Sequence, residues 1–252
     1  MAKLGHHTWN ELCSQPTAWR DALAVLTAQA TQLGAHPALT QASHIIWSGC
    51  GSPFYLAHAM ARITQQLDSR PTYAVPSSEL WLNPAASIPR DAKPTLILLS
   101  RSGKTTEVLR AAAQFRHHAP HGQIITVTCY ADRPLATVGD INIILPSGQE
   151  ESIAQTRAFT VMQIGALGVI WLLSKRQLSE LAVLGDACAD VLARYQEQCL
   201  AIGSNPAYER FYFLGSGYRY GLASEASLKM KEMSLTTSEP FHHMEFRHGP
   251  QS

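Results

Sequence analysis

The chain has 252 residues, a length that suits one or two domains, and 46% of its residues are hydrophobic, with 16 glycines and 14 prolines. This composition supplies a buried core and excludes disordered, collagen-like and low-complexity proteins. The 20 Lys and Arg residues and 19 Asp and Glu residues leave a formal net charge of +1. Binding to a phosphate backbone requires a larger basic excess, so we expect no nucleic-acid partner.

The five cysteines are odd in number and form no C-x-x-C pair. This pattern argues against a disulfide framework and against a zinc ribbon. The N-terminal segment lacks the apolar stretch of a signal peptide, and the longest apolar run, 158–173, is interrupted by polar residues and too short for a membrane span. We therefore expect a cytoplasmic protein with no membrane partner.

Residues 8–31 show a loosely amphipathic helical pattern that Pro16 interrupts. From His44 onward, the short apolar runs HIIW, TLILL, QIITVTC and INIIL alternate with segments of helical composition, and a weaker run at 73–75 predicts a further strand. This alternation is typical of a parallel α/β sheet. Segments 156–174 and 178–200 are predicted helices that complete the unit.

A turn signal at 204–206 ends the first unit, and the sequence after it resembles the start of that unit. The segment IIWSGCGSPFYLAHA from Ile45 aligns without gaps on FYFLGSGYRYGLASEA from Phe211, and both contain G-x-G after an apolar strand. This repeat predicts tandem copies of one domain. The predicted fold class is a doubly wound parallel α/β sheet, with a helical extension at 1–43, a first domain at 44–205 and a second at 206–252.

A second copy as long as the first would run to about residue 340. We therefore expect residues 206–252 to hold only the start of the second domain. We also expect the chain by itself to expose apolar surface there, and to be poorly active or prone to aggregation.

Three hydroxyl residues follow the apolar run TLILL and precede a helical stretch. Ser100, Ser102 and Thr105 would lie at the carboxyl end of a strand and the N-terminus of a helix, where free N–H groups favour a phosphate. One serine alone is more often an ordinary helix cap. Three hydroxyls in the pattern S-x-S-x-x-T favour an anion site, and Gly103 allows the backbone to approach a ligand closely.

Two nucleotide-binding motifs are incomplete. The segment GKT at 103–105 resembles the end of a P-loop, but the motif needs glycine at position 98, which is Leu98. Both G-x-G turns lack the third glycine of a dinucleotide fingerprint. We therefore expect no dinucleotide cofactor.

In the predicted helix 220–234, Glu225, Lys229 and Glu232 are spaced i, i+4, i+7. This spacing places the three charges on one helical face. The ordinary interpretation is a solvated charge stripe. The alternative is a carboxylate beside an ammonium in a pocket, an arrangement that can transfer a proton to or from carbon.

The segment 238–250 contains three histidines and two carboxylates. It lacks H-E-x-x-H, and Pro240 and Gly249-Pro250 predict a loop, so we expect no metal site. Histidines titrate near neutral pH, which suits His248 to ring opening or proton shuttling, although an inert surface histidine is the ordinary case.

Three motifs together resemble the SIS (sugar isomerase) family of phosphosugar-binding domains. They are GCGS at 49–52, SRSGKTTEV at 100–108, and GSGYRYGLASEASLKMKE at 215–232 followed by EFRHGP at 245–250. With the helical lead-in LCSQPTAW, the resemblance covers nearly the whole chain. It is strongest to tandem-domain phosphosugar isomerases and aminosugar-phosphate deaminases, and it implies a flavodoxin-like sandwich.

The resemblance implies roles for particular residues. The sugar phosphate would be bound by Ser52, Ser100, Arg101 through its backbone, Ser102 and Thr105. Glu232 would move a proton between C1 and C2, with Lys229 and Glu225 flanking it. His248 would assist ring opening, often across a subunit interface in this family.

The loop at 150–156, with Ala154 and Thr156, resembles a family loop that closes on the ligand. The chain departs from the family here, because SIAQTR stands where GVASTK is usual. Pro53 likewise stands where many members have a second hydroxyl residue.

These observations predict a phosphosugar aldose–ketose isomerase or an isomerising aminosugar-6-phosphate deaminase. The resemblance implies a homodimer with shared active sites, and the chemistry needs no metal or redox cofactor. The alternative is a non-catalytic regulatory protein that binds phosphosugars. Glu232 with His248 favours the enzyme, because a sensor needs neither a base nor a ring opener.

Overall fold

Five parallel strands form the central sheet of the computed structural model, which describes residues 5–90 and 92–252. The predicted apolar runs, including the weak one, all form strands, in the order β2-β1-β3-β4-β5. After β1 the chain forms β2 on one side of it and then β3 on its other side, so the strand order reverses between β1 and β3. In such sheets, ligands bind at the carboxyl ends of the two strands where the order reverses. The strands are β1 (His44–Gly49), β2 (Thr72–Pro76), β3 (Pro94–Ser100), β4 (Gln123–Thr128) and β5 (Ile141–Ile144).

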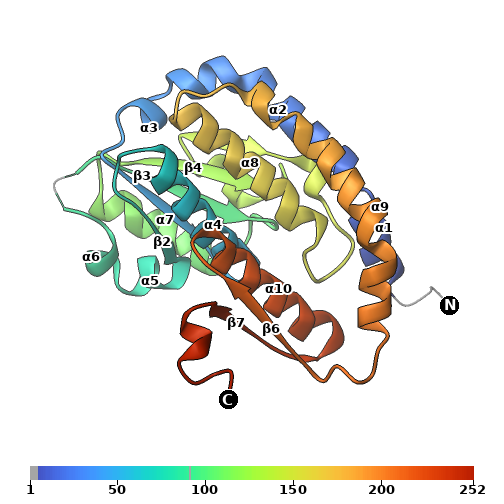
Figure 1. The fold of residues 1–252 in the computed structure, drawn as a ribbon. Helices are drawn as coiled ribbons and strands as arrows, with labels where there is room; N and C mark the ends of the chain where they lie inside the picture. Colours follow the sequence, from blue (N-terminus) through green and yellow to red (C-terminus); the bar gives the residue numbers. More distant parts are fainter. Residues whose placement is uncertain (1–4, 91) are drawn as a thin grey trace.

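Helices cover both faces of this sheet (Figure 1). They are α1 (His6–Cys13), α2 (Gln15–Ala35), α3 (Pro37–Thr40), α4 (Ser52–Leu67), α5 (Ser77–Leu82), α6 (Pro84–Ser87), α7 (Thr106–His118), α8 (Arg157–Leu173) and α9 (Val183–Gly203), with 3-10 turns η1 (Pro134–Thr137), η2 (Pro146–Gly148) and η3 (Leu178–Leu181). Burial on both faces explains why the inner strands β1, β3 and β4 are largely continuous apolar runs instead of alternating ones.

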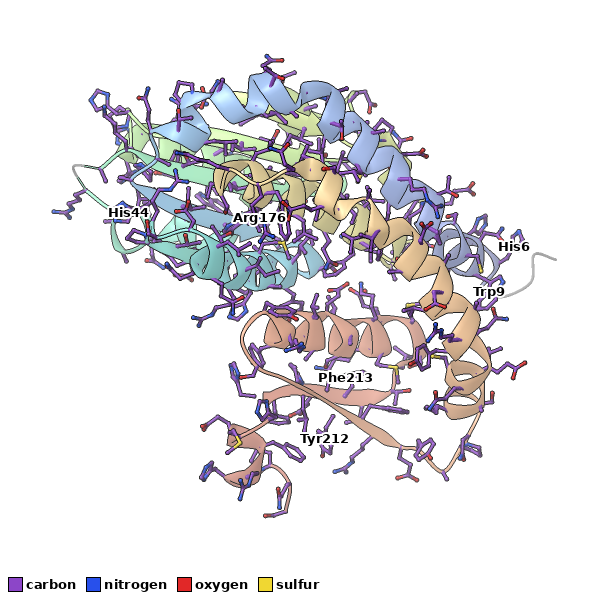
Figure 2. All side chains as sticks on the ribbon, turned by 45° about the horizontal axis from the view of Figure 1, so that its top comes forward. His6, Trp9, His44, Arg176, Tyr212 and Phe213 are labelled. Atoms are coloured by element: carbon purple, nitrogen blue, oxygen red, sulfur yellow. The ribbon has the colours of Figure 1, made fainter. Side chains whose placement is uncertain are left out.

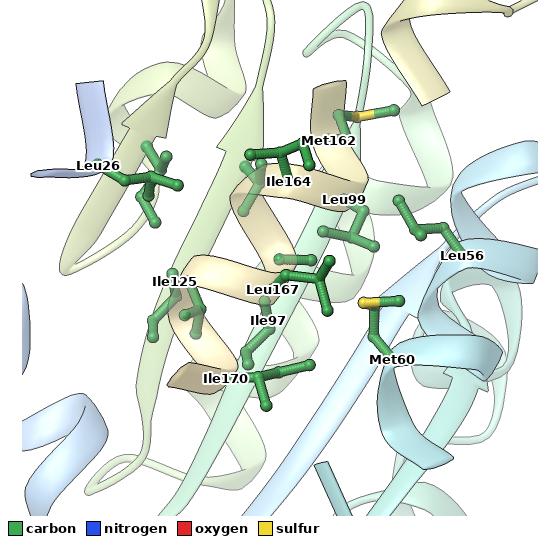
Figure 3. Close-up of a cluster of buried hydrophobic side chains, with 14 of the residues drawn as sticks. Leu26, Leu56, Met60, Ile97, Leu99, Ile125, Met162, Ile164, Leu167 and Ile170 are labelled. Atoms are coloured by element: carbon green, nitrogen blue, oxygen red, sulfur yellow. The ribbon is translucent and has the colours of Figure 1, made fainter. Parts of the chain in front are cut away.

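The larger apolar core lies between the sheet and helices α2, α4 and α8 (Figure 3). Ile97, Leu99 and Ile125 of the sheet meet Met60 of α4 and Ile170 of α8 there, and all five are fully or almost fully buried. A smaller core on the other face packs α5 and α7 against alternate residues of the same strands. The two cores hold the carboxyl ends of β1 and β3 in a fixed relation.

The N-terminal helical pattern forms two helices that meet at Ser14, and Pro16 lies in the first turn of α2. Proline is tolerated there because the first N–H groups of a helix have no intrahelical acceptor. Beyond η3, α9 runs along α2 and leads to the second unit (Figure 1). Within the described ranges, no helix combines the length and apolar composition that a membrane crossing requires.

The second unit contains β6 (Arg210–Gly215), α10 (Tyr218–Ser234), β7 (Thr237–His242) and η4 (Glu245–Arg247). Its first turn repeats the shape of the turn after β1, since Gly51 and Gly217 have φ of 60° and 59° and the same ψ of −129°. Helix α10 packs on α4. At Gly221 a Cβ would lie 2.5 Å from the carbonyl oxygen of Tyr55, so glycine allows the two helices to approach closely.

The prediction of a loop throughout 238–250 is wrong for its first part. Residues 237–242 form β7, which pairs in parallel with β6 and places Pro240 opposite Phe213. Proline removes one N–H donor, which a strand with a single described neighbour tolerates. The buried Ser238 hydroxyl donates a hydrogen bond to the carbonyl oxygen of Ser227, at 2.8 Å, and so ties β7 to α10.

Candidate active site

Three hydroxyls converge in the loop between β3 and α7. The Oγ atoms of Ser100 and Ser102 lie 3.2 and 3.4 Å from Oγ1 of Thr105. Gly103 has φ of 62° and donates its N–H to the Ser100 hydroxyl at 3.2 Å. Thr105 is the N-cap of α7, yet its side chain makes no capping hydrogen bond. The ordinary helix-cap interpretation therefore does not apply to Thr105, and the arrangement suits an anion at the helix N-terminus.

Ser52 lies beside this loop in the topology, because it begins α4 after β1, and β1 is hydrogen-bonded to β3. Its side chain is buried, and its hydroxyl accepts a hydrogen bond from Nζ of Lys229 at 3.1 Å. The two partners are 177 positions apart in the sequence. The contact connects the turn after β1 with the charged face of α10.

Helix α10 presents Glu225, Lys229 and Glu232 on one face, as their spacing predicts. The Lys229 ammonium lies 3.4 Å from Oε1 of Glu225 and 2.5 Å from Oε2 of Glu232. The side chains of Glu225 and Lys229 are only 8% and 18% exposed, whereas that of Glu232 is 40% exposed. A solvated charge stripe would expose all three, so the face is a partly buried cluster with Glu232 at its open end.

Glu225 is the buried member of the cluster. Neither of its carboxylate oxygens meets hydrogen-bond geometry with any residue that the structure describes, although Lys229 is within ion-pair distance. Burial raises the pKa of Glu225 to about 7, and the neighbouring Lys229 ammonium offsets this effect only in part. A carboxyl group that titrates near neutral pH is typical of sites that transfer protons.

A second buried carboxylate, Glu150, holds the loop that precedes α8. Its Oε1 accepts hydrogen bonds from the N–H and hydroxyl of Thr156 and from the N–H of Ala158, at 2.9 to 3.0 Å. Its Oε2 lies 3.2 Å from the guanidinium of Arg101. The Arg101 side chain thus turns towards this loop, while its backbone stays between Ser100 and Ser102. The Thr156 hydroxyl donates to Glu150.

Helix α1 holds the same loop from the other side, which the sequence did not predict. Glu11 is 5% exposed, and its Oε1 accepts hydrogen bonds from the N–H groups of Glu151 and Ser152 at 2.7 and 3.1 Å. Burial acts to raise the pKa of Glu11, but hydrogen bonds from Ser152 and Glu151 lower it below its ordinary value. These partners are about 140 positions apart, and no local spacing signals the contact.

A cavity of about 700 Å³ opens beside the candidate base. It is bounded by α1, by the loop before α8 and by the end of α10. The lining residues are Gly5, Thr8, Trp9, Leu12, Ile153, Ala154, Glu232 and Met233. The structure therefore places the predicted loop residue Ala154 and the predicted base Glu232 on one cavity.

His248 is the predicted site residue that stays apart. It follows η4, its side chain is exposed, and within residues 5–90 and 92–252 it forms no hydrogen bond or ion pair with α4 or α10. The candidate site within one chain therefore consists of the hydroxyl loop, Ser52, the α10 cluster and the loop before α8.

Comparison with known proteins places the chain in a family. A family model described as the SIS domain matches residues 38–168. A protein of Streptomyces coelicolor named as a D-galactosamine-6-phosphate deaminase is 25% identical over 272 residues, which cover 98% of this chain and 66% of that protein. A glutamine–fructose-6-phosphate aminotransferase (isomerizing) of Sulfurisphaera tokodaii is 29% identical over 155 residues, which cover 61% of this chain and 26% of that protein. The chain thus spans about a quarter to two thirds of the length of these curated relatives.

Solved structures share the fold. The tagatose-6-phosphate ketose/aldose isomerase of Escherichia coli superposes with a TM-score of 0.88 at 23% identity, covering 98% of this chain and 70% of that one. The glucosamine-6-phosphate deaminase of Thermotoga maritima superposes with a TM-score of 0.73 at 25% identity, covering 92% of this chain and 72% of that one. At 98% coverage, the similarity to the Escherichia coli structure extends into β6, α10 and β7, which lie outside the segment that the family model matches.

Proposed function

The chain belongs to the SIS-domain family, and from that premise we propose that it is a phosphosugar aldose–ketose isomerase or an isomerising aminosugar-6-phosphate deaminase. The substrate would be a hexose 6-phosphate or hexosamine 6-phosphate. One observation carries the proposal: the Lys229 ammonium contacts both Ser52, on the anion-binding side, and Glu232, on the cavity side. A phosphate and a reacting carbon of one small sugar would then both lie within reach of this cluster.

The phosphate would be held by the hydroxyls of Ser52, Ser100, Ser102 and Thr105, with N–H groups at the beginning of α7. Such donors favour a dianion at a helix N-terminus and require no metal ion. Fixing one end of an open-chain sugar places its other end at a defined distance, so that a single carboxylate can act on it. The phosphate loop therefore supplies binding and orientation, while α10 supplies the chemistry.

Glu232 would take a proton from one of the two carbons C1 and C2 and return it to the other. The electron pair of the broken C–H bond would pass into an enediol, or into an enolamine for an amino sugar, and Lys229 would stabilise the developing negative charge. Glu225 lies within ion-pair distance of Lys229 and would set the ammonium's position. In a deaminase, hydrolysis of the resulting imine would release ammonia.

Ring opening and closure of the site would use the remaining predicted residues. We propose that His248 acts in the site of a partner subunit within a homodimer, because its side chain is exposed and does not reach α10 of its own chain. Ala154 and Thr156 would lie on a loop that closes over the sugar. The Glu150 carboxylate holds this loop by accepting hydrogen bonds from Thr156 and Ala158.

Incubating the protein with fructose 6-phosphate, glucosamine 6-phosphate and their galacto counterparts, and measuring ketose and ammonia, tests the proposal. We expect Glu232→Gln to abolish turnover and to leave sugar-phosphate binding intact. We expect Ser102→Ala to weaken the binding of phosphosugars far more than the binding of unphosphorylated sugars. Unchanged turnover in Glu232→Gln would contradict the assignment of the base, and binding without turnover of any substrate would favour the regulatory alternative.

A further inference from the structure

The cavity beside Glu232 is bounded on one side by a helix outside the segment that the family model matches. Gly5, Thr8, Trp9 and Leu12 come from α1 and the segment before it, and they lie across the cavity from Glu232 and Met233 of α10. Ile153 and Ala154 of the loop before α8 complete the lining. The N-terminal helical extension thus forms a wall of the cavity that contains the candidate base.

Three large apolar side chains of this cavity are exposed around one carboxylate. Trp9 is 42% exposed, Ile153 94% and Met233 48%, and each comes from a different element. Apolar groups that gather in a concave surface around a few polar groups are typical of a small-molecule site. Trp9 offers the largest flat apolar surface of the three.

The position of Trp9 relative to the loop is fixed by the neighbouring residues of α1. Glu11 accepts two hydrogen bonds from the loop backbone, and Oγ1 of Thr8 lies 3.0 Å from Oγ of Ser152. In Figure 2, Trp9 lies at the end of the molecule where α1 and α9 come together. These contacts flank Trp9 in α1 and fix the helix that carries it beside the loop, so that Trp9 lines the cavity.

We propose that Trp9 is a specificity-determining residue, whose indole packs against the carbon chain of the phosphosugar at its Glu232 end. The inference rests on the proposed function and adds a contact that the family motifs do not include. The C–H face of a sugar is apolar, and an aromatic ring buries it at small conformational cost, while hydroxyls at the edge stay free for polar partners. The same wall would discriminate against sugars that present a hydroxyl, instead of C–H groups, to the indole.

Titration of the full chain with fructose 6-phosphate and with inorganic phosphate separates this contact from the phosphate site. We expect Trp9→Ala to weaken the binding of fructose 6-phosphate about tenfold and to leave the affinity for inorganic phosphate unchanged, because only the sugar reaches the indole. Trp9→Phe keeps an aromatic face and should retain most of the affinity. The emission of Trp9, which is partly exposed, should change when fructose 6-phosphate binds, and Trp9→Phe should lose this change.

Tyr195→Ala is the matched control. Tyr195 is 50% exposed and lines, together with Trp9, a separate apolar groove between α1 and α9, but it does not line the cavity with Glu232. We expect this variant to bind both ligands like the wild type. Equal weakening of fructose 6-phosphate in Trp9→Ala and Tyr195→Ala would show that α1 packing causes the effect, and it would overturn the inference.

Two further outcomes are distinguishable. If the wild type binds and converts fructose 6-phosphate while Trp9→Ala behaves identically, with the same far-ultraviolet circular dichroism, the role of Trp9 is refuted and the proposed function stands. If the wild type binds neither inorganic phosphate nor any of fructose 6-phosphate, glucosamine 6-phosphate and their galacto counterparts, the proposed function fails and the inference fails with it.

Discussion

Replacing Glu225 by glutamine tests the electrostatics of the α10 cluster directly. The carboxyl group is buried, lacks good hydrogen bonds among the described residues, and has Lys229 and Glu232 as its charged neighbours. Its pKa is raised from an ordinary 4.5 to about 7 by burial, with Lys229 opposing the shift and Glu232 adding to it. Glutamine keeps the shape of the side chain and removes the titration.

The sign of the effect follows from proton binding. Between pH 4.5 and about 7 the folded chain keeps a proton on Glu225 that the unfolded chain releases, so the free energy of unfolding falls as pH rises through this window. The stability from this group is fully present below pH 4.5 and lost above pH 7. At about 1.4 kcal/mol per pKa unit, the loss amounts to roughly 3 kcal/mol.

Urea unfolding of wild type and Glu225→Gln from pH 4.5 to pH 8.5 measures this loss. We expect the variant to gain roughly 3 kcal/mol relative to wild type over that range, because it has no buried charge to form. Glu232→Gln is the control, since Glu232 lies at the open end of the same cluster, and its difference from wild type should change much less with pH. Parallel stability curves for wild type and Glu225→Gln would refute the reasoning.

Two further changes test the supports of the site. Glu150→Ala should cost about 3 kcal/mol in urea unfolding, because it removes the charged partner of the largely buried Arg101 and the acceptor of the loop's hydrogen bonds, and it should speed hydrogen exchange across residues 151–157; unchanged exchange there would show that Glu150 does not hold the loop. Gly221→Ala should lower the free energy of unfolding by about 1 to 3 kcal/mol, because its Cβ would meet the backbone of α4. Gly203→Ala, with open space around its Cβ, should be neutral or stabilising by up to about 1 kcal/mol, and equal effects of both changes would refute the close-packing argument.

The inner strands β1, β3 and β4 were predictable because they are buried on both faces. Their runs are largely apolar and end at turns, so their positions are visible without knowledge of their neighbours. The strand β7 was missed for the opposite reason. Its sequence, TSEPFH, is polar and contains Pro240, and it becomes a strand only because β6 lies beside it and Ser238 bonds to α10.

The phosphate loop was also predictable, because Ser100, Ser102 and Thr105 lie within six consecutive residues and their convergence depends only on the local turn. The face of α10 was predictable from its helical spacing. Its burial was not, since the exposure of Glu225 depends on how closely α10 approaches α4 at Gly221.

The sequence by itself determined the local features of this protein: the strands other than β7, the main helices, the hydroxyl loop, the repeated G-x-G turn and the charged helical face. Only the tertiary structure decided which of these features meet. It joined Lys229 to Ser52 and Glu11 to the loop before α8, and it placed Trp9 across a cavity from Glu232. The reason is physical: periodicity and turn chemistry act over a few residues, whereas burial and pairing of charges depend on segments more than 100 positions apart.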